Sequence, residues 1–172
     1  MAEEIEPFGN FYEDFVVGKV YKHPLGRTIT ESDNTWFTLI TMNTNPYHFD
    51  KEYSSQSPYG KILVNSCLTL SIVTGQSVID LSQNAFANLG WDDIKLPNPL
   101  YVGDTIYSES KITDKRESET REYGGIVSVS TIGYNQNGDI VISWDRKFFV
   151  YKKDSDYAKF NRPKPDSPWE NE

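Results

Sequence analysis

The chain has 172 residues, of which 37% are hydrophobic, 14% aromatic and 24% charged. This composition is typical of one globular domain and excludes a disordered or fibrous chain. With 17 basic and 25 acidic residues the formal net charge is −8, which excludes the dense basic face needed for sequence-independent nucleic-acid binding. One cysteine and two histidines exclude a disulfide framework and leave little for a metal site, so we expect no metal.

The N-terminus is acidic and lacks the basic start and apolar core of a signal peptide. The most apolar stretch, residues 62–81, carries too many polar side chains to cross a membrane, so we expect no membrane partner. The single cysteine is typical of a reducing compartment, which predicts the cytoplasm. We expect a leader at residues 1–10, one domain at residues 11–153, and a tail with three prolines at residues 154–172.

Residues 20–29 form a weak strand candidate, interrupted by proline and glycine, which suits a sheet edge. A helix is expected from Thr30 to Met42, with Thr30 as its cap and Asp33 near its positive end. It carries an apolar stripe of Trp36, Phe37, Leu39 and Ile40.

The turn-forming run of residues 43–46 ends this helix, and a second helix is expected from about Leu63. The second helix is apolar on most of its circumference, which predicts that it is enclosed, with Cys67 as a small core residue. From about Asn84 the pattern changes to strands. Alternating runs predict strands at residues 105–112, 126–132 and 140–151, and the last two form a hairpin around the Asn-Gly turn. The fold class is therefore α+β.

The distinctive piece is residues 43–50, Asn-Thr-Asn-Pro-Tyr-His-Phe-Asp. His48 follows a stiff Asn-Pro turn, and imidazole is the side chain best suited to take and return a proton near neutral pH. Asn43 and Asn45 could orient a ligand or water. The same run also has a purely structural interpretation as a helix-stopping turn, and the two interpretations are compatible.

The second segment, residues 59–66, leads into the apolar helix. A helix that begins near Asn65 presents unpaired backbone N–H groups, which can stabilise negative charge on a carbonyl oxygen. A base together with an oxyanion site indicates enolate chemistry. Gly60 and the small helix residues could equally serve packing alone.

These segments resemble the MaoC-like hydratase family, the (R)-specific enoyl-CoA hydratases of hot-dog fold. The family pattern Asp-x-Asn-Pro-x-His-x-Asp is similar to residues 43–50, and its aromatic-glycine loop and helix start are similar to residues 59–67. Residues 96–104 resemble the family's entry to a strand, and the resemblance spans about residues 11–151.

The resemblance implies a single hot-dog unit, in which an antiparallel sheet wraps a long central helix, and a homodimer or higher homo-oligomer. It implies reversible water addition across the double bond of a 2-enoyl-CoA, with acyl-CoA as substrate and no separate cofactor. By the same resemblance the catalytic residues are Asn43, His48 and Ser66. The implied substrate-binding residues are Asn45, Tyr59, Gly60 and Asn65.

Two positions depart from the family pattern. Asn43 stands in place of the catalytic aspartate, and an amide cannot titrate. Asn65 and Ser66 replace a His-Gly pair, although a backbone N–H at Ser66 does not depend on the side chain. We favour proton transfer by His48 with Asn43 positioning the water. The alternative is a substitute carboxylate from Glu31, Asp33 or Asp50.

The residues of four segments resemble those of a branch of the family that hydrates branched dicarboxylic thioesters, mesaconyl-CoA or itaconyl-CoA. They are residues 38–43, 63–66, 74–78 and 88–92. A second carboxylate would need a guanidinium partner, and the sequence does not choose among the candidates Arg27, Arg116, Arg121 and Arg146. Two alternative functions remain open: a hot-dog acyl-CoA thioesterase, and a non-catalytic acyl-CoA-binding protein.

Overall fold

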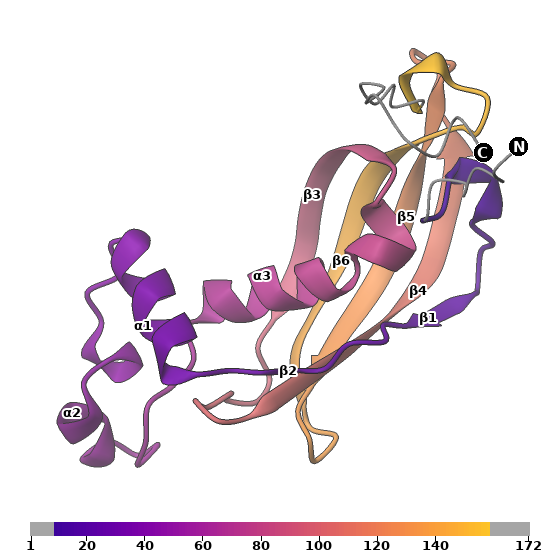
Figure 1. The fold of residues 1–172 in the computed structure, drawn as a ribbon. Helices are drawn as coiled ribbons and strands as arrows, with labels where there is room; N and C mark the ends of the chain where they lie inside the picture. Colours follow the sequence, from indigo (N-terminus) through magenta and orange to yellow (C-terminus); the bar gives the residue numbers. More distant parts are fainter. Residues whose placement is uncertain (1–8, 159–172) are drawn as a thin grey trace, which may run out of the picture.

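The computed structural model describes residues 9–158, which form one antiparallel sheet crossed by a helix (Figure 1). The strands are β1 (Val20–Lys22), β2 (Arg27–Thr28), β3 (Ala85–Lys95), β4 (Thr105–Glu117), β5 (Gly124–Tyr134) and β6 (Ile140–Tyr151). The α-helices are α1 (Glu31–Ile40), α2 (Lys51–Ser55) and α3 (Ser66–Gln76). Shorter helical turns are η1 (Tyr12–Asp14), η2 (Pro46–His48), η3 (Val78–Ser82) and η4 (Asp156–Ala158).

The order across the sheet is β1-β4-β5-β6-β3, and β2 pairs with another part of β4. The three long strands β4, β5 and β6 confirm the predicted alternating runs, and each of the first two extends beyond its predicted bounds. The predicted β5–β6 hairpin is confirmed as well. Its turn is fixed by Asn135, whose side-chain oxygen accepts the backbone N–H groups of Asn137 and Asp139 at 2.9 and 3.0 Å.

The weak edge strand predicted at residues 20–29 is present as two short pieces, β1 and β2. The interruption contains Gly26, where an added Cβ would lie 2.4 Å from the ring of Tyr107. Only glycine fits this close approach. The other edge is β3, for which the sequence suggested no bounds. Its pairing with β6 shifts register at three places, so no regular alternation of apolar residues marks it.

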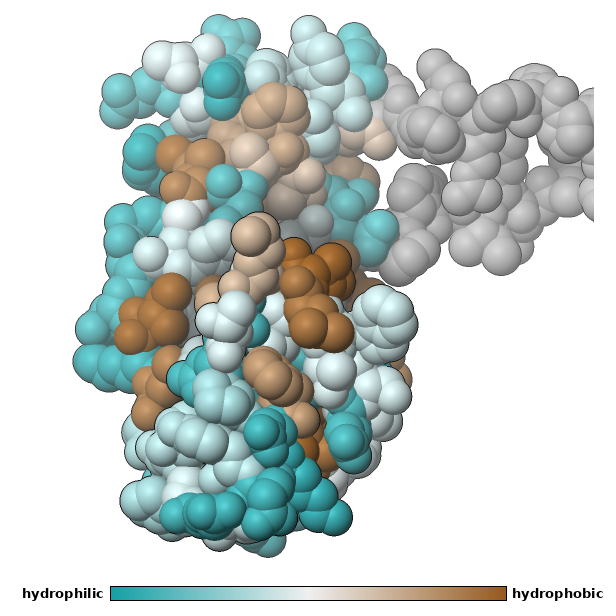
Figure 2. All heavy atoms as spheres, turned by 90° about the vertical axis from the view of Figure 1, so that its left-hand side faces the viewer, coloured by the Kyte–Doolittle hydropathy of each residue, from teal (hydrophilic) through white to brown (hydrophobic). Residues whose placement is uncertain are grey.

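The helix α1 begins as predicted, with a capping box between Thr30 and Asp33. Its buried face differs from the apolar stripe, because the buried residues are Asn34 and Thr38. Most of the stripe faces outward: Trp36, Leu39 and Ile40 are 70%, 59% and 74% exposed. Figure 2 shows the end of the molecule that carries α1 and α2, where brown apolar patches lie among hydrophilic residues.

The end of α1 is a Schellman motif, in which Met42 N–H donates to the carbonyl of Leu39 and Asn43 N–H donates to that of Thr38. Met42 therefore takes the left-handed position, with φ of 57°. This position favours glycine, so a methionine there is strained. The motif delivers the chain directly into the turn at residues 43–46.

The prediction that the central helix is enclosed is wrong for the described chain. The sheet covers one side of α3, where Leu68, Thr69 and Val73 are buried. Cys67 is exposed, so its expected place in the core is also wrong. Apolar residues on most sides of a predicted helix therefore did not distinguish a helix covered on all sides from one covered by a single sheet.

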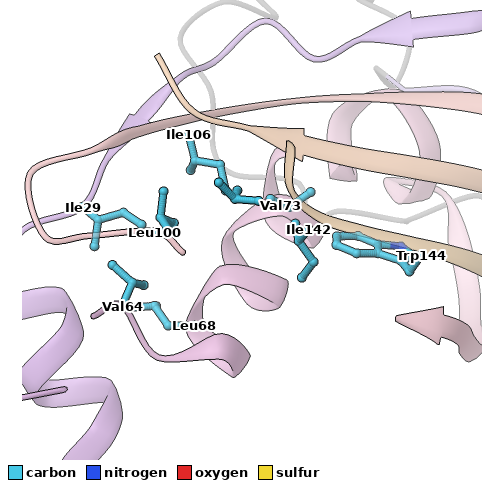
Figure 3. Packing of buried hydrophobic residues seen from close by; sticks show 9 residues of the cluster. Ile29, Val64, Leu68, Val73, Leu100, Ile106, Ile142 and Trp144 are labelled. Atoms are coloured by element: carbon cyan, nitrogen blue, oxygen red, sulfur yellow. The ribbon is translucent and has the colours of Figure 1, made fainter. Parts of the chain in front are cut away.

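The core lies between α3 and the sheet and consists of two clusters. One surrounds the first turns of α3 and is drawn in Figure 3; it contains Ile29, Val64, Leu68, Val73, Leu100, Ile106, Val141, Ile142 and Trp144. The other lies beyond the end of α3 and contains Tyr12, Phe15, Leu81, Ile112, Val127, Val129, Phe148 and Val150. Burial of this apolar surface is the main favourable term that holds α3 on the sheet.

A buried polar chain ties the end of the helical segment to the sheet. The ring of His23 contacts Asp80 through Nδ1 at 2.7 Å and Ser110 through Nε2 at 3.0 Å. The Ser110 hydroxyl continues to that of Thr131 at 2.8 Å. These contacts give His23 a structural role.

The tail beyond residue 153 begins with η4, and Tyr157 packs on Tyr123 with ring centroids 4.8 Å apart. The rest of the expected tail and most of the expected leader lie outside the described residues. Among residues 9–158, no helix is long and apolar enough to cross a membrane.

The α1 cap gives the first testable prediction. Hydrogen bonds from Thr30 lower the pKa of Asp33, and Arg27 adds an ion pair at 2.7 Å. Asp33→Ala should reduce the free energy of unfolding by about 1 kcal/mol at pH 7. Because the folded pKa is lowered, this contribution is complete above the ordinary value of 3.8 and is lost as the pH falls through the folded pKa.

Urea unfolding of Asp33→Ala and the natural chain at pH 7 and below pH 3.8 measures this difference. Glu31→Ala is the matched control, because Glu31 lies in the same first turn and is exposed. A deficit that does not shrink at low pH would show that the carboxylate charge is not the stabilising element.

Candidate active site

A hollow of about 290 Å³ lies where the start of α3 meets the loop between β3 and β4. Its walls come from three parts of the chain that are distant in sequence. The lining residues are His48, Tyr59, Leu63, Val64, Ser66, Thr69, Leu96, Pro97, Asn98, Pro99, Leu100 and Val141. The structure thus brings together His48, Ser66 and Tyr59, as the sequence segments 43–50 and 59–66 suggested.

His48 is the last residue of η2, a turn that begins with Pro46 and is capped by Asn45. The imidazole is half-buried, and its Nδ1 lies 3.1 Å from the carbonyl oxygen of Leu63. A carbonyl oxygen can only accept, so Nδ1 carries the hydrogen of the neutral ring. The lone pair of Nε2 is then free to act as a base.

Ser66 is the first residue of α3 and lines the same hollow. The helix is capped by Asn65, whose side-chain oxygen accepts the N–H of Cys67 at 2.9 Å. Within residues 9–158, no acceptor engages the N–H of Ser66. This N–H and the positive end of the helix can together stabilise an oxyanion.

Asn34 joins these two parts and was not anticipated from the sequence. It is fully buried, and its Nδ2 donates to the carbonyls of His48 and Leu63 at 2.7 and 2.9 Å. Its Oδ1 accepts the backbone N–H of Asn65 at 2.8 Å. A polar residue in the middle of a helix carries no sequence signal for such contacts, because their partners are distant backbone groups.

The predicted residues Asn43 and Asn45 lie in the turn before His48 and do not line the hollow. The side-chain oxygen of Asn43 accepts the N–H of Asn45 at 3.0 Å. That of Asn45 accepts the N–H of Tyr47 at 3.1 Å. In this arrangement both amides hold the turn, and a contact with water or substrate remains a prediction for each.

Of the predicted substrate-binding residues, Tyr59 reaches the hollow and is 44% exposed. Gly60 has a positive φ of 70° and makes the bend that presents Tyr59. Asn65 is buried and divides its amide between Cys67 and Thr38, whose Oγ1 is 3.4 Å away. These contacts favour a capping role for Asn65.

The hollow lacks formal charge. No carboxylate, lysine or arginine among the described residues lines it. Asp50, one suggested substitute base, caps α2 through the N–H of Tyr53 at 2.9 Å, and Asp33 caps α1. Nor do the described residues bring three His, Cys, Asp or Glu side chains together as metal ligands would be.

None of the four candidate arginines lines the hollow. Arg27 pairs with Asp33, and Arg121 lies over the rings of Phe86 and Phe149. Arg116 lies near the far end of β4 and donates to a neighbouring carbonyl. Arg146 is buried beside Phe148, and burial lowers its pKa to about 10.

The chain is similar to several known proteins. β-Methylmalyl-CoA dehydratase of Chloroflexus aurantiacus is 32% identical over 98% of this chain and 47% of its own length. Mesaconyl-CoA hydratase of Cereibacter sphaeroides is 29% identical over 86% of this chain and 43% of its own. The chain therefore spans about half the length of the curated relatives it matches.

Among solved structures, a Mycobacterium tuberculosis protein with a double hotdog fold superposes with a TM-score of 0.76. It is 18% identical, and the match covers 92% of this chain and 52% of that protein, so it shows the fold alone. The family model described as MaoC like domain matches residues 14–134, which include the His48 turn, α3 and the strands β1 to β5. The chain belongs to the MaoC-like family and has the hot-dog fold.

Proposed function

We propose that this chain carries the catalytic hollow of a hydro-lyase that adds water reversibly across the double bond of a 2-enoyl-CoA. The observation that carries the proposal is the meeting of His48 and the α3 N-terminus in one hollow. The names of the relatives, a dehydratase and a hydratase acting on CoA thioesters, support the same reaction class.

In the proposed reaction, Nε2 of His48 takes a proton from water while the water oxygen bonds to the β-carbon. The electrons of the double bond move toward the thioester oxygen, where the N–H of Ser66 stabilises the developing charge. The imidazolium then returns its proton to the α-carbon. One O–H bond of water and the π bond between the α- and β-carbons are broken, and one C–O and one C–H bond are formed.

The residues that line the hollow do not specify the acyl group, so the substrate class is proposed from the names of the relatives. Mesaconyl-type substrates carry a second carboxylate, and the described hollow offers it only neutral groups such as Asn98 and Tyr59. Burying that carboxylate without a cation is costly. We therefore propose that a cation from outside this chain completes the site when the substrate is dicarboxylic.

The alternative thioesterase needs a carboxylate near the thioester to activate water. The described residues that line the hollow include no carboxylate, which disfavours the thioesterase hypothesis. A non-catalytic acyl-CoA-binding role is favoured by one observation, the engagement of Asn43 in a turn where the family pattern has an acid. Turnover separates these functions.

We propose a homodimer or higher homo-oligomer on the basis of exposed apolar surface. The edge strand β3 exposes Phe86, Leu89, Trp91 and Ile94. An edge strand of this kind is normally paired or covered. The relatives are about twice as long, which agrees with a second unit beside this one. A cytoplasmic location stays a prediction.

The decisive experiment is turnover. Crotonyl-CoA or mesaconyl-CoA should lose its enoyl absorbance with this protein, without release of free thiol. His48→Gln removes the base and should lower kcat by about 100-fold or more. Glu52→Gln on the neighbouring α2 changes an exposed charge and should leave turnover unchanged.

Release of free CoA would identify a thioesterase. Tight binding of the thioester without any conversion would identify the non-catalytic role. Hydration that survives His48→Gln in full would contradict the assignment of the base while leaving the reaction class intact.

The turn at Asn43 gives a separate prediction. A carboxylate can accept the N–H of Asn45 as the amide does, so Asn43→Asp should preserve the turn. We expect hydratase activity to be retained or to rise, because the change restores the family's titratable group. Steady-state kinetics measure the hydratase activity of the variant, and an unfolding curve measures its stability. A complete loss of activity in a folded variant would show that the amide has its own task.

A further inference from the structure

We propose that Asn34 is the positioning residue of this site: its carboxamide sets the distance and orientation between the His48 imidazole and the N-terminus of α3. The inference rests on the proposed function, since it concerns the same base and oxyanion site. Nothing in the sequence pattern or in the resemblance assigned a role to Asn34.

The first support is the connectivity of the three hydrogen bonds. Asn34 belongs to α1, whereas its partners are the backbone of His48 in η2 and of Leu63 and Asn65 at the entry to α3. The two chain segments that form the candidate site are therefore both anchored to one side chain. The contact to Asn65 lies one residue before the Ser66 N–H.

The second support is the shared carbonyl. The oxygen of Leu63 accepts from Nδ2 of Asn34 at 2.9 Å and faces Nδ1 of His48 at 3.1 Å. Asn34 thus fixes the acceptor that in turn selects the ring tautomer with a free Nε2. Tautomer selection through the hydrogen bond at the other ring nitrogen is a general way of setting a histidine base.

The third support is burial. Asn34 is 0% exposed, so its donors and acceptor cannot exchange with bulk water. Losing them leaves two carbonyls and one N–H unsatisfied in the interior. Asn34 does not line the hollow, so a change there should affect the geometry of the base more than the binding of the thioester.

Two variants test the proposal. Asn34→Asp keeps the oxygen that accepts the N–H of Asn65, but it replaces the Nδ2 donor with an oxygen that faces the carbonyls of His48 and Leu63. Asn34→Ala removes all three hydrogen bonds and adds no bulk. Each should lower kcat by about 10- to 100-fold with KM changed by less than about 3-fold, because small misplacements of a base are costly. Thr131→Val is the matched control, since it removes a buried hydrogen bond to Ser110 in the sheet.

Asn34→Asp adds a pH readout that lost stability would not produce. Burial between carbonyls raises the pKa of the new carboxyl, and its protonated form can donate to one of them. The ratio of variant to natural kcat should therefore rise as the pH falls. The ratio is taken against the natural chain at each pH, so that any pH dependence common to both proteins cancels.

A spectroscopic arm keeps the inference testable even if the natural protein hydrates no thioester. The chain has two histidines, so ¹⁵N-labelled imidazole signals can be assigned with His48→Gln. We expect His48 to show protonated Nδ1 and bare Nε2 in the natural chain, and averaged tautomers in the folded Asn34 variants.

The outcomes separate the two proposals. No turnover by the natural protein together with loss of the fixed tautomer in the variants would contradict the proposed function and support the role of Asn34. An unchanged tautomer and undiminished kcat in both variants would overturn the role of Asn34. So would an equal loss of kcat in Thr131→Val, because the effect would then follow stability alone.

Discussion

Backbone groups that leave regular structure inside a protein must find partners, and at this site one amide side chain supplies them. Asn34 satisfies two carbonyls and one N–H where the turn of η2 and the entry to α3 approach α1. No strand or helix could pair these groups, because the segments meet at their irregular ends. The helix α1 contributes no residue to the lining of the hollow. Through Asn34 it nevertheless holds the two segments that carry His48 and the start of α3.

This arrangement explains why α1 turns its apolar stripe outward. Its inward face must carry amide and hydroxyl groups that reach backbone, and Asn34 and Thr38 occupy it. Of the apolar stripe only Phe37 packs against the core, and Trp36, Leu39 and Ile40 stay exposed. Together with the exposed residues of β3 they form surface that one hot-dog unit leaves uncovered. This exposed surface and the uncharged lining of the hollow are the observations on which the proposed second unit rests.

The sequence was informative where structure is local. The capping box at Thr30, the Asn-Gly hairpin and the alternation of β4 to β6 all follow from neighbouring residues, and the structure confirms them. The sequence was uninformative where the hydrogen-bonding partners are distant along the chain. The strand β3 shows no regular alternation of apolar and polar residues, because its pairing with β6 shifts register. The contacts of Asn34 depend on backbone groups 14 to 31 residues away. The family resemblance indicated His48 and Ser66 as candidate site residues, but it could not show that Asn65 caps α3.

The substitution at Asn43 has a physical consequence beyond the loss of a titratable group. Its side chain follows a Schellman motif whose left-handed residue is Met42, so the backbone there is strained and needs an acceptor to fix the turn. An amide supplies that acceptor at every pH, whereas a carboxylate loses part of its acceptor strength when protonated. The hydrogen bond that holds the turn before His48 therefore does not depend on the protonation of a carboxylate. Asn34 is likewise an uncharged amide, and it holds the backbone carbonyls of His48 and Leu63.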